Sequence, residues 1–189
     1  MGKLFFRFRG LLLAPYGLLL LILGKPSFLS FALGLSLALL GESLRLWGVG
    51  YAGKSTRKSV LDAPKLVTSG PYALIRHPLY IGNSFMGLGG AIMASGHQSA
   101  LIQSLFFLAF LFFYGVVYGV IIPLEEQFLE KQFGIPYLEY KKKVPQLIPT
   151  GKSYPVSDHF FSWSVAFNSE THTLIPFAIL VAVLGLKIR

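Results

Sequence analysis

The sequence predicts an all-α, polytopic integral membrane protein with about five transmembrane helices. Hydrophobic residues make up 53% of the 189 residues and charged residues only 13%, whereas a soluble domain carries about 25% charged residues. The mean hydropathy is +0.61. Apolar runs of membrane-spanning length, separated by short polar breaks, recur along the chain.

Charge and cysteine content exclude several classes of function. The formal net charge is +9, but no aromatic-basic module accompanies it, so we expect contact with anionic lipid headgroups and no nucleic-acid partner. The chain has no cysteine, which excludes disulfides and thiolate chemistry. Its four histidines are scattered without metal-ligand spacing, so we expect no metal site.

Two apolar runs open the chain. The first covers Leu11 to Leu23 and the second covers Phe28 to about Tyr51. No small-residue cleavage signal follows the first run, so it is interpreted as an uncleaved helix. Because only residues 24–27 separate the runs, we expect a hairpin. A polar segment with several glycines and prolines follows at residues 52–78.

A second hairpin is predicted further along the chain. Its helices cover Leu79 to Ala94 and Ala100 to Ile122, joined by a polar turn at residues 95–99. Pro123 is expected to end the second of these helices, because proline lacks the N–H that a helix interior requires.

The remaining third of the chain mixes charge with apolar side chains. Residues 124–149 are predicted to form an amphipathic surface helix, interrupted near Gly134 and Pro136. Residues 150–172 are expected to be irregular. The last run, Thr173 to Leu186, is short for a span, so a tilted or partly buried fifth helix is predicted.

We treat residues 1–189 as a single membrane domain. Its parts are an N-terminal hairpin (1–51), a core (52–149) and a C-terminal interfacial segment with the last helix (150–189). Lysine and arginine set the orientation, because cytoplasmic loops carry the excess. With the N-terminus cytoplasmic, the residues sharing that side are Lys3, Arg7, Arg9, Lys54, Arg57, Lys58, Lys65, Arg76, Lys131, Lys141, Lys142, Lys143 and Lys152. Only Lys25, Lys187 and Arg189 lie opposite.

Two polar clusters flank the second hairpin. Residues 76–80 place Pro78 in a first helical turn, where free N–H groups form a site for an anion such as a carboxylate; an interfacial anchor is the alternative. Glu125 and Glu126 can bind a cation or ligand hydroxyls, or simply begin a solvated helix. Because a hairpin returns to its starting side, both clusters are expected at one mouth.

Two further clusters carry charge. Residues 133–145 are expected to lie on the membrane surface, with three consecutive lysines facing anionic lipid. Glu42 and Arg45 lie inside the second span at i,i+3 spacing. Ionisable residues in a span indicate function, and mutual structural neutralisation is the equal alternative.

Taken in order, these motifs resemble the signature of the isoprenylcysteine carboxyl methyltransferase family, which is related to the membrane phospholipid N-methyltransferases. The resemblance covers roughly residues 40–149. Its motifs are Gly70-Pro71-Tyr72, Arg76-His77-Pro78-Leu79-Tyr80-Ile81-Gly82, Glu125-Glu126, and Phe133-Gly134 with Tyr137, Tyr140, Val144 and Pro145. Gly41 to Trp47 also resembles bacterial members.

The resemblance implies a membrane enzyme that uses S-adenosylmethionine, releases S-adenosylhomocysteine, and methylates a lipidic or lipid-modified acceptor. The family-typical acceptor is the prenylcysteine α-carboxylate, and the active site is cytoplasmic. By motif position, the implied cofactor-binding residues are Arg76, His77, Pro78, Tyr80, Gly82, Glu125, Glu126, Tyr137 and Tyr140. Glu139 and Lys143 are implied nearest the reacting end. The family usually has arginine in place of Lys143, and lysine lacks the bidentate fork.

Several alternatives stay open at this point. A phospholipid amine or a small thiol would serve as acceptor in the same chemistry. An NADPH-dependent, sterol-reductase-like protein shares part of the membrane architecture, although such proteins are much longer. A non-enzymatic membrane scaffold would use the same clusters as interfacial anchors only.

Overall fold

A computed structural model describes residues 8–53, 63–151, 153–155 and 160–188. Within those ranges every regular element is helical. The elements are α2 (Arg9–Leu12), α3 (Ala14–Leu23), α4 (Phe28–Ala52), the 3-10 turn η2 (Gly70–Ala73), α5 (Pro78–Ser95), α6 (Ala100–Phe133), α7 (Ile135–Lys143) and α8 (Trp163–Gly185).

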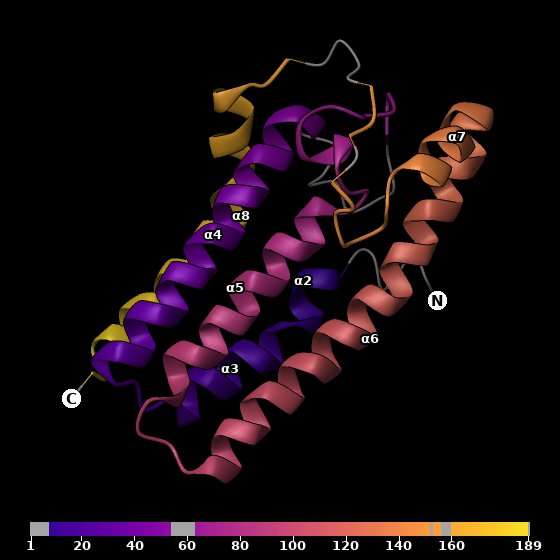
Figure 1. The fold of residues 1–189 in the computed structure, drawn as a ribbon. Coiled ribbons are helices and arrows are strands. Elements are labelled where there is room, and N and C mark those ends of the chain that lie inside the picture. The colour runs from indigo at the N-terminus through magenta and orange to yellow at the C-terminus, as the bar shows by residue number, and fades with distance from the viewer. Residues whose placement is uncertain (1–7, 54–62, 152, 156–159, 189) are drawn as a thin grey trace.

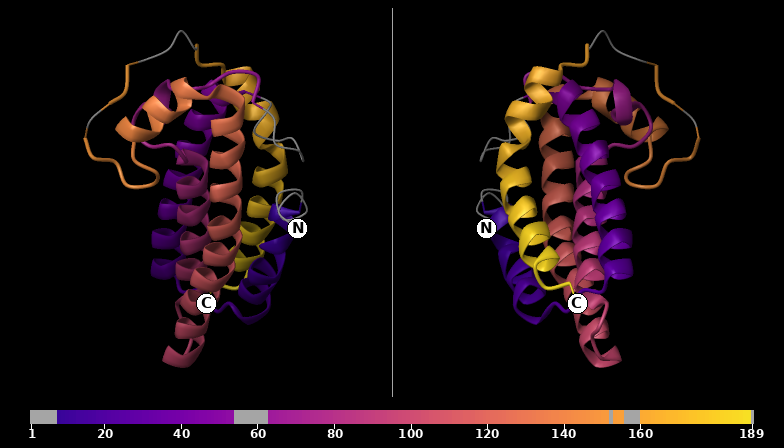
Figure 2. Two further views of the ribbon diagram at one scale, coloured as in Figure 1. Left: turned by 90° about the vertical axis from the view of Figure 1, so that its right-hand side faces the viewer. Right: turned by 90° about the vertical axis from the view of Figure 1, so that its left-hand side faces the viewer.

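The long helices form a bundle in which α5 lies between α4 and α6 and α8 packs against α4 (Figure 1). Figure 2 shows that α7 and the segments preceding α5 and α8 gather at one end of the bundle, whereas the α5–α6 turn and the C-terminus lie at the other. We call the first of these the α7 end. The predicted second hairpin is confirmed, because α5 begins at Pro78 and α6 returns to the α7 end.

The tightest contact in the bundle joins α4 to α5 through glycine. A Cβ built on Gly41 would lie 2.5 Å from the carbonyl oxygen of Gly82, and one on Gly89 would lie 2.5 Å from that of Gly34. Small residues allow helix backbones to approach closely, which is a main source of helix association in membranes. This contact fixes the position of α5, whose N-terminus carries the 76–80 motif.

Three helices, α4, α6 and α8, are long and apolar enough to cross a membrane among the described residues. The apolar stretch Gly10–Leu23 is shorter. The chain therefore fits an integral membrane protein, and the predicted count of five complete spans is not confirmed.

The prediction that Pro123 ends a helix was wrong. α6 runs for 34 residues from Ala100 to Phe133 and contains Pro123 in its interior. A proline removes a single helical hydrogen bond, and helices in membrane proteins tolerate it where neighbouring groups compensate. As a result, Glu125 and Glu126 lie within the continuous helix, and only α7 forms a separate surface helix.

The prediction of an irregular segment at residues 150–172 was wrong from Trp163 onwards. α8 begins there, with the Ser162 side chain accepting a hydrogen bond from the Val165 N–H at 3.4 Å. Polar residues such as Ser169 and Glu170 lower the hydropathy of this stretch, but both are buried. Their burial against α4 allows a 23-residue helix where the sequence predicted a short one.

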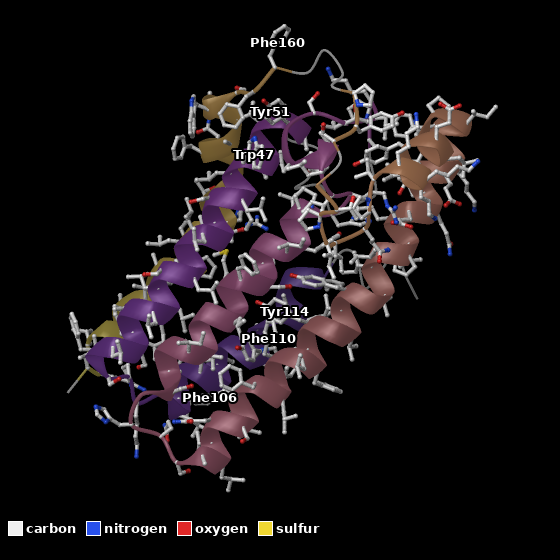
Figure 3. The ribbon with its side chains drawn as sticks, viewed as in Figure 1. Trp47, Tyr51, Phe106, Phe110, Tyr114 and Phe160 are labelled. Carbon is white, nitrogen blue, oxygen red and sulfur yellow. The ribbon has the colours of Figure 1, made fainter. Side chains whose placement is uncertain are left out.

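The predicted hairpin of the first two helices was also wrong. α3 packs on α5, α6 and α8 instead of along α4. Its Tyr16 hydroxyl donates to the carbonyl of Gly87 at 2.8 Å. Phe106, Phe110 and Tyr114 lie along α6 on the side that faces α5 (Figure 3), and Tyr16 and Phe106 belong to the largest buried cluster. The α4 face that a hairpin would need is occupied by α5.

Candidate functional site at the α7 end

Main-chain hydrogen bonds join the segment before α5 to the segment after α7. The Arg76 N–H donates to the Pro145 carbonyl at 2.9 Å, and the His77 N–H donates to the Gln146 carbonyl at 3.2 Å. Gly70, at φ +60°, turns the chain against the ring of Tyr51, and a Cβ there would be strained. Residues 69 positions apart in sequence thus meet in a fixed frame at the α7 end.

Arg76 extends this frame with its side chain. Its Nη1 donates to the carbonyls of Lys141 and Val144 at 2.9 and 2.7 Å. These carbonyls belong to the last turn of α7 and the residue after it, where helical acceptors have no partner in the helix. Arg76 therefore caps the C-terminus of α7 and holds this helix next to the N-terminus of α5.

The Glu126 carboxylate lies at the centre of the frame. Its Oε1 accepts from Arg76 Nε at 2.9 Å, and it also lies 3.1 Å from His77 Nε2. Its Oε2 lies 3.0 Å from Lys141 Nζ. Glu126 is buried, and the surrounding positive groups favour its ionised form. Both of its oxygens bind protein groups, so Glu126 holds the surrounding side chains of the mouth in place.

Lys141 links two acids of α6 from the surface. Its Nζ lies 2.5 Å from Glu130 Oε1 and 3.0 Å from Glu126 Oε2. The hydrogen bonds that Lys141 donates, to Glu130 first and to Glu126 second, raise the pKa of Lys141 above its usual 10.5. The ammonium group therefore stays charged throughout the neutral range.

Glu125 differs from its neighbour because it is accessible. Its side chain is 31% exposed, and its Oε2 accepts from the Tyr80 hydroxyl at 2.7 Å. The Tyr80 ring packs on Tyr118, with ring centroids 4.8 Å apart. Glu125 is thus held in place but keeps acceptor capacity toward the mouth.

Two buried tyrosines of α7 cover the site on the α7 side. Tyr137 and Tyr140 are 1% and 2% exposed. The Tyr140 hydroxyl donates to the carbonyl of Tyr72 at 2.7 Å, whereas the Tyr137 hydroxyl has no hydrogen-bond partner among the described residues. Burial raises the pKa of both phenols, so both are neutral donors. A buried donor without a protein partner indicates a place for a ligand.

One cavity of about 1010 Å³ begins at this mouth and continues into the bundle. Its polar part is lined by Tyr72, Arg76, His77, Tyr80, Glu125, Tyr137 and Tyr140. Its apolar part is lined by residues of α3, α5 and α8, among them Leu20, Met86, Gly90, Pro176, Phe177 and Leu180. The cavity therefore joins a polar chamber to an apolar one.

Arg45 lines the cavity between these two parts, together with Asn83 and Thr173. It donates to both oxygens of Glu170 at 2.9 and 2.7 Å, and its Nε lies 3.5 Å from Glu42 Oε2. The predicted Glu42–Arg45 pair is confirmed, but Glu170 makes the shorter contacts.

The structure separates the residues that the resemblance implies for cofactor binding. Arg76, His77, Pro78, Tyr80, Glu125, Tyr137 and Tyr140 line the cavity. Glu126 adjoins this group through Arg76 and His77 without lining the cavity. Gly82 faces α4, and a Cβ there would lie 2.5 Å from Arg45 Cγ. Its position is explained by close helix packing.

The two residues implied nearest the reacting end lie on the outer side of α7. Glu139 and Lys143 are exposed and do not line the cavity. Lys143 Nζ lies 5.6 Å from the ring centroid of Tyr154. The helical period explains this placement, because Tyr137 and Tyr140 turn one face of α7 inward and leave Glu139 on the opposite face.

Sequence reasoning missed the contribution of α8 and of Asn83. Thr173 and His172 line the cavity from α8, and Glu170 binds Arg45. A signal was present, because Glu170 closely precedes the last apolar run, and an acid carried into a span requires a partner. Arg45, the one span residue of opposite charge already identified, was that partner.

Comparison with known proteins identifies one family. The model of the isoprenylcysteine carboxyl methyltransferase (ICMT) family matches residues 32–130. This range covers more than half of the chain and includes most of α4, all of α5 and most of α6, with both polar motifs of the mouth. No solved structure matches the chain significantly.

Curated proteins similar to this chain include two named as isoprenylcysteine methyltransferases and one named as a metal resistance protein. Protein-S-isoprenylcysteine O-methyltransferase B of Arabidopsis thaliana is 33% identical over 120 residues, 61% of this chain and 57% of the relative. A probable protein-S-isoprenylcysteine O-methyltransferase of Oryza sativa subsp. indica is 37% identical over 126 residues, 65% and 62% respectively. The cobalt-zinc-cadmium resistance protein CzcN of Cupriavidus metallidurans is 36% identical over 137 residues, 72% and 54%. The chain thus spans less than two thirds of the length of these relatives.

Proposed function

Because this chain belongs to the isoprenylcysteine carboxyl methyltransferase family, we propose that it is an S-adenosylmethionine-dependent methyltransferase that esterifies the α-carboxylate of a prenylcysteine. The observation that carries the proposal is the single cavity that joins a polar mouth to an apolar interior. A water-soluble methyl donor and a lipid-modified acceptor need this combination.

The polar mouth fits S-adenosylmethionine, which supplies a methyl group on a positively charged sulfonium. The donor carries an ammonium group, ribose hydroxyls and a carboxylate. The accessible Glu125 carboxylate offers an acceptor for the ammonium group and the ribose hydroxyls. The Tyr137 hydroxyl, buried without a protein partner among the described residues, offers a donor. These two residues, with Tyr80 positioning Glu125, are proposed as the polar contacts.

Arg76, His77 and Glu126 are proposed to shape the mouth. The Arg76 and His77 side chains each contact the Glu126 carboxylate, and Arg76 also holds the α7 segment. The positive charge of Arg76 is matched by Glu126 at 2.8 Å. Their part in cofactor binding is to keep Glu125 and Tyr137 at a fixed separation, since alignment of bound groups contributes much of an enzyme's rate.

The acceptor is proposed to place its prenyl chain in the apolar part of the cavity. α3 and α8 wall this part with leucine, phenylalanine and proline, and burying each CH₂ is worth about 0.8 kcal/mol. A carboxylate is ionised near neutral pH, so the nucleophile needs no general base. This removes the need for Glu139 and Lys143, which are exposed.

Exclusion of water is the proposed role of α7. Its Tyr137 and Tyr140 are almost fully buried above the mouth, and Tyr140 is fastened to the Tyr72 carbonyl. Removing water strengthens the electrostatic interactions inside a site and prevents hydrolysis.

We also propose that the α7 end is cytoplasmic. Of the described residues, Lys65, Arg76, Lys131 and the three lysines of α7 are placed near this end, whereas Lys25 and Lys187 belong to the opposite one. Such a bias indicates the cytoplasmic side. α5 is proposed to cross with α4, α6 and α8, whereas α3, at ten residues, is about 15 Å long and crosses only about half of the hydrocarbon.

Methyl transfer from labelled S-adenosylmethionine tests the function. The purified chain is incubated with N-acetyl-S-farnesylcysteine, phosphatidylethanolamine or a small thiol, and the methylated product is extracted. We expect label in a base-labile methyl ester of the first acceptor only. Label in the lipid or the thiol would replace the proposed acceptor.

Calorimetry tests the cofactor independently of the acceptor. We expect S-adenosylhomocysteine to bind and NADPH to give no heat. Binding of NADPH alone would indicate a reductase, and absence of binding by both would indicate a non-enzymatic scaffold. Glu125→Gln is the matched variant, expected to weaken S-adenosylhomocysteine binding while the protein remains folded.

A further inference from the structure

α8 forms part of the cavity although it lies outside the stretch that matches the family model, residues 32–130. Its cavity-lining residues lie on one face of the helix and are His172, Thr173, Pro176, Phe177, Ile179 and Leu180. The apolar part of the cavity is therefore walled in part by an element outside the matched stretch.

A buried ion pair joins α8 to α4. Arg45 on α4 donates through Nη2 to Glu170 Oε1 at 2.9 Å and Oε2 at 2.7 Å, and to Thr173 Oγ1 at 3.2 Å. Arg45 is 4% exposed and Glu170 is 0% exposed. Ionisable groups inside spans are expensive unless paired, so this pair fixes both the rotation and the depth of α8.

The Arg45–Glu170 pair lies at the depth where the lining of the cavity changes from polar to apolar. Arg45 lines the cavity and also contacts Asn83 Oδ1 through Nη1 at 2.5 Å. Asn83 lies five residues, or about 7.5 Å, into α5 from Pro78 at the mouth. Glu170 itself does not line the cavity, so any effect of Glu170 on a ligand must pass through α8 or Arg45.

The width of the apolar part of the cavity depends on where α8 lies. A Cβ built on Gly90 would lie 3.0 Å from Leu20 Cδ1 and 3.4 Å from Leu180 Cδ2. α3, α5 and α8 therefore meet there in van der Waals contact. A rotation of α8 would change the width of the apolar chamber.

We propose that Glu170 is a positioning residue that, by binding Arg45, sets α8 as the wall against which the acceptor's apolar chain packs. α8 then determines which acceptor chains are bound, and the cofactor part of the site is independent of it. This inference rests on the proposed function, because it assigns the apolar chamber to a prenylated acceptor.

Kinetics of Glu170→Gln test the positioning role. Gln keeps the shape of the side chain but removes the charge that binds Arg45. We expect the KM for N-acetyl-S-farnesylcysteine to rise at least tenfold, with kcat and the Kd for S-adenosylhomocysteine changed less than twofold. Glu170→Asp should recover most of the KM. Asn168→Ala, at an exposed position of α8 where the side-chain amide donates to Ser164, is the control. Equal losses of cofactor binding and acceptor binding in Glu170→Gln would overturn the proposal.

Labelling provides a readout that needs no turnover, and it is simple because the chain has no cysteine. Leu180→Cys places a single thiol on the α8 wall. Gly119→Cys places one on α6, outside the cavity and with no atom within 4 Å of its Cβ. We expect N-acetyl-S-farnesylcysteine to slow maleimide labelling at 180 at least fivefold and at 119 less than twofold.

Combining the two changes completes the test. Adding Glu170→Gln to Leu180→Cys should abolish the protection. Absence of protection at 180 in the otherwise unchanged protein would overturn the proposal even if Glu170→Gln failed to fold. If the unaltered chain methylates the farnesylated probe but 180 is not protected, only the role of α8 fails. If 180 is protected but no methyl ester forms, the proposed function fails and the α8 wall stands.

Discussion

Arg76 and Glu126, fifty residues apart in sequence, meet through a single carboxylate oxygen. Arg76 Nε donates to Glu126 Oε1 at 2.9 Å, and Nη2 lies 2.8 Å from the same oxygen. The side chains are only 10% and 8% exposed. Since Arg76 also ends α7 through two carbonyls, this contact joins α5, α6 and α7 at the mouth.

Removing the carboxylate of Glu126 should destabilise the protein. Glu126→Ala leaves Arg76 buried without its counter-charge, at a cost on the order of 3 kcal/mol, which corresponds to a melting midpoint about 10 °C lower. Thermal unfolding in detergent measures it. Glu125→Ala, which loses one hydrogen bond from Tyr80, should cost about 1 kcal/mol. Equal shifts for the two variants would contradict the central role of Glu126.

The two tyrosines of α7 should respond differently to loss of their hydroxyls. Tyr137→Phe removes a buried donor without a partner among the described residues, so stability should not fall, whereas S-adenosylhomocysteine binding should weaken by about 1 kcal/mol, or about fivefold. Tyr140→Phe removes the bond to Tyr72 and should lower the melting midpoint. Calorimetry measures the cofactor affinity of each variant, and thermal unfolding measures its stability. Unchanged cofactor affinity in Tyr137→Phe would remove Tyr137 from the site.

Gly82 should behave as a packing residue. A methyl group there would meet the Gly41 carbonyl at 2.6 Å, and overpacking of this kind costs about 1–3 kcal/mol. We expect Gly82→Ala to lower the melting midpoint by about 5 °C, with cofactor affinity of the folded protein within twofold. Gly119→Ala, where the added methyl meets nothing within 4 Å, should not destabilise. A stable Gly82→Ala variant that lost cofactor would restore Gly82 to the pocket.

Glu139 and Lys143 test whether a residue's role follows from its place in the structure or from its position in the family motif. Both are exposed on the outer side of α7, and surface charges contribute about 0–1 kcal/mol. We therefore expect Glu139→Gln and Lys143→Met to change the methylation rate less than about threefold, about 0.7 kcal/mol. A hundredfold loss in either variant would show that α7 rearranges to bring these side chains to the reacting groups.

Local patterns predicted the elements whose boundaries are set by nearby residues. The bounds of α4 and α5 follow Ser27, Gly53, Pro78 and the glycines of their interface. Pro123 and the start of α8 were predicted incorrectly, because neighbouring helices override a local helix-breaking signal or supply a buried partner for a charge. The polar mouth was predicted because a hairpin necessarily returns its two ends to one side.

The sequence by itself determined that the chain is helical and membrane-embedded, and that its histidine and acidic motifs belong to one end of the bundle, because hydrophobicity, breaks and basic residues are local properties. Only the tertiary structure decided which acid is accessible, which glycine packs a helix, that α8 lines the cavity, and that Glu170 of α8 binds Arg45. These depend on contacts between residues as far as 125 positions apart, and such contacts form only when the whole bundle is assembled.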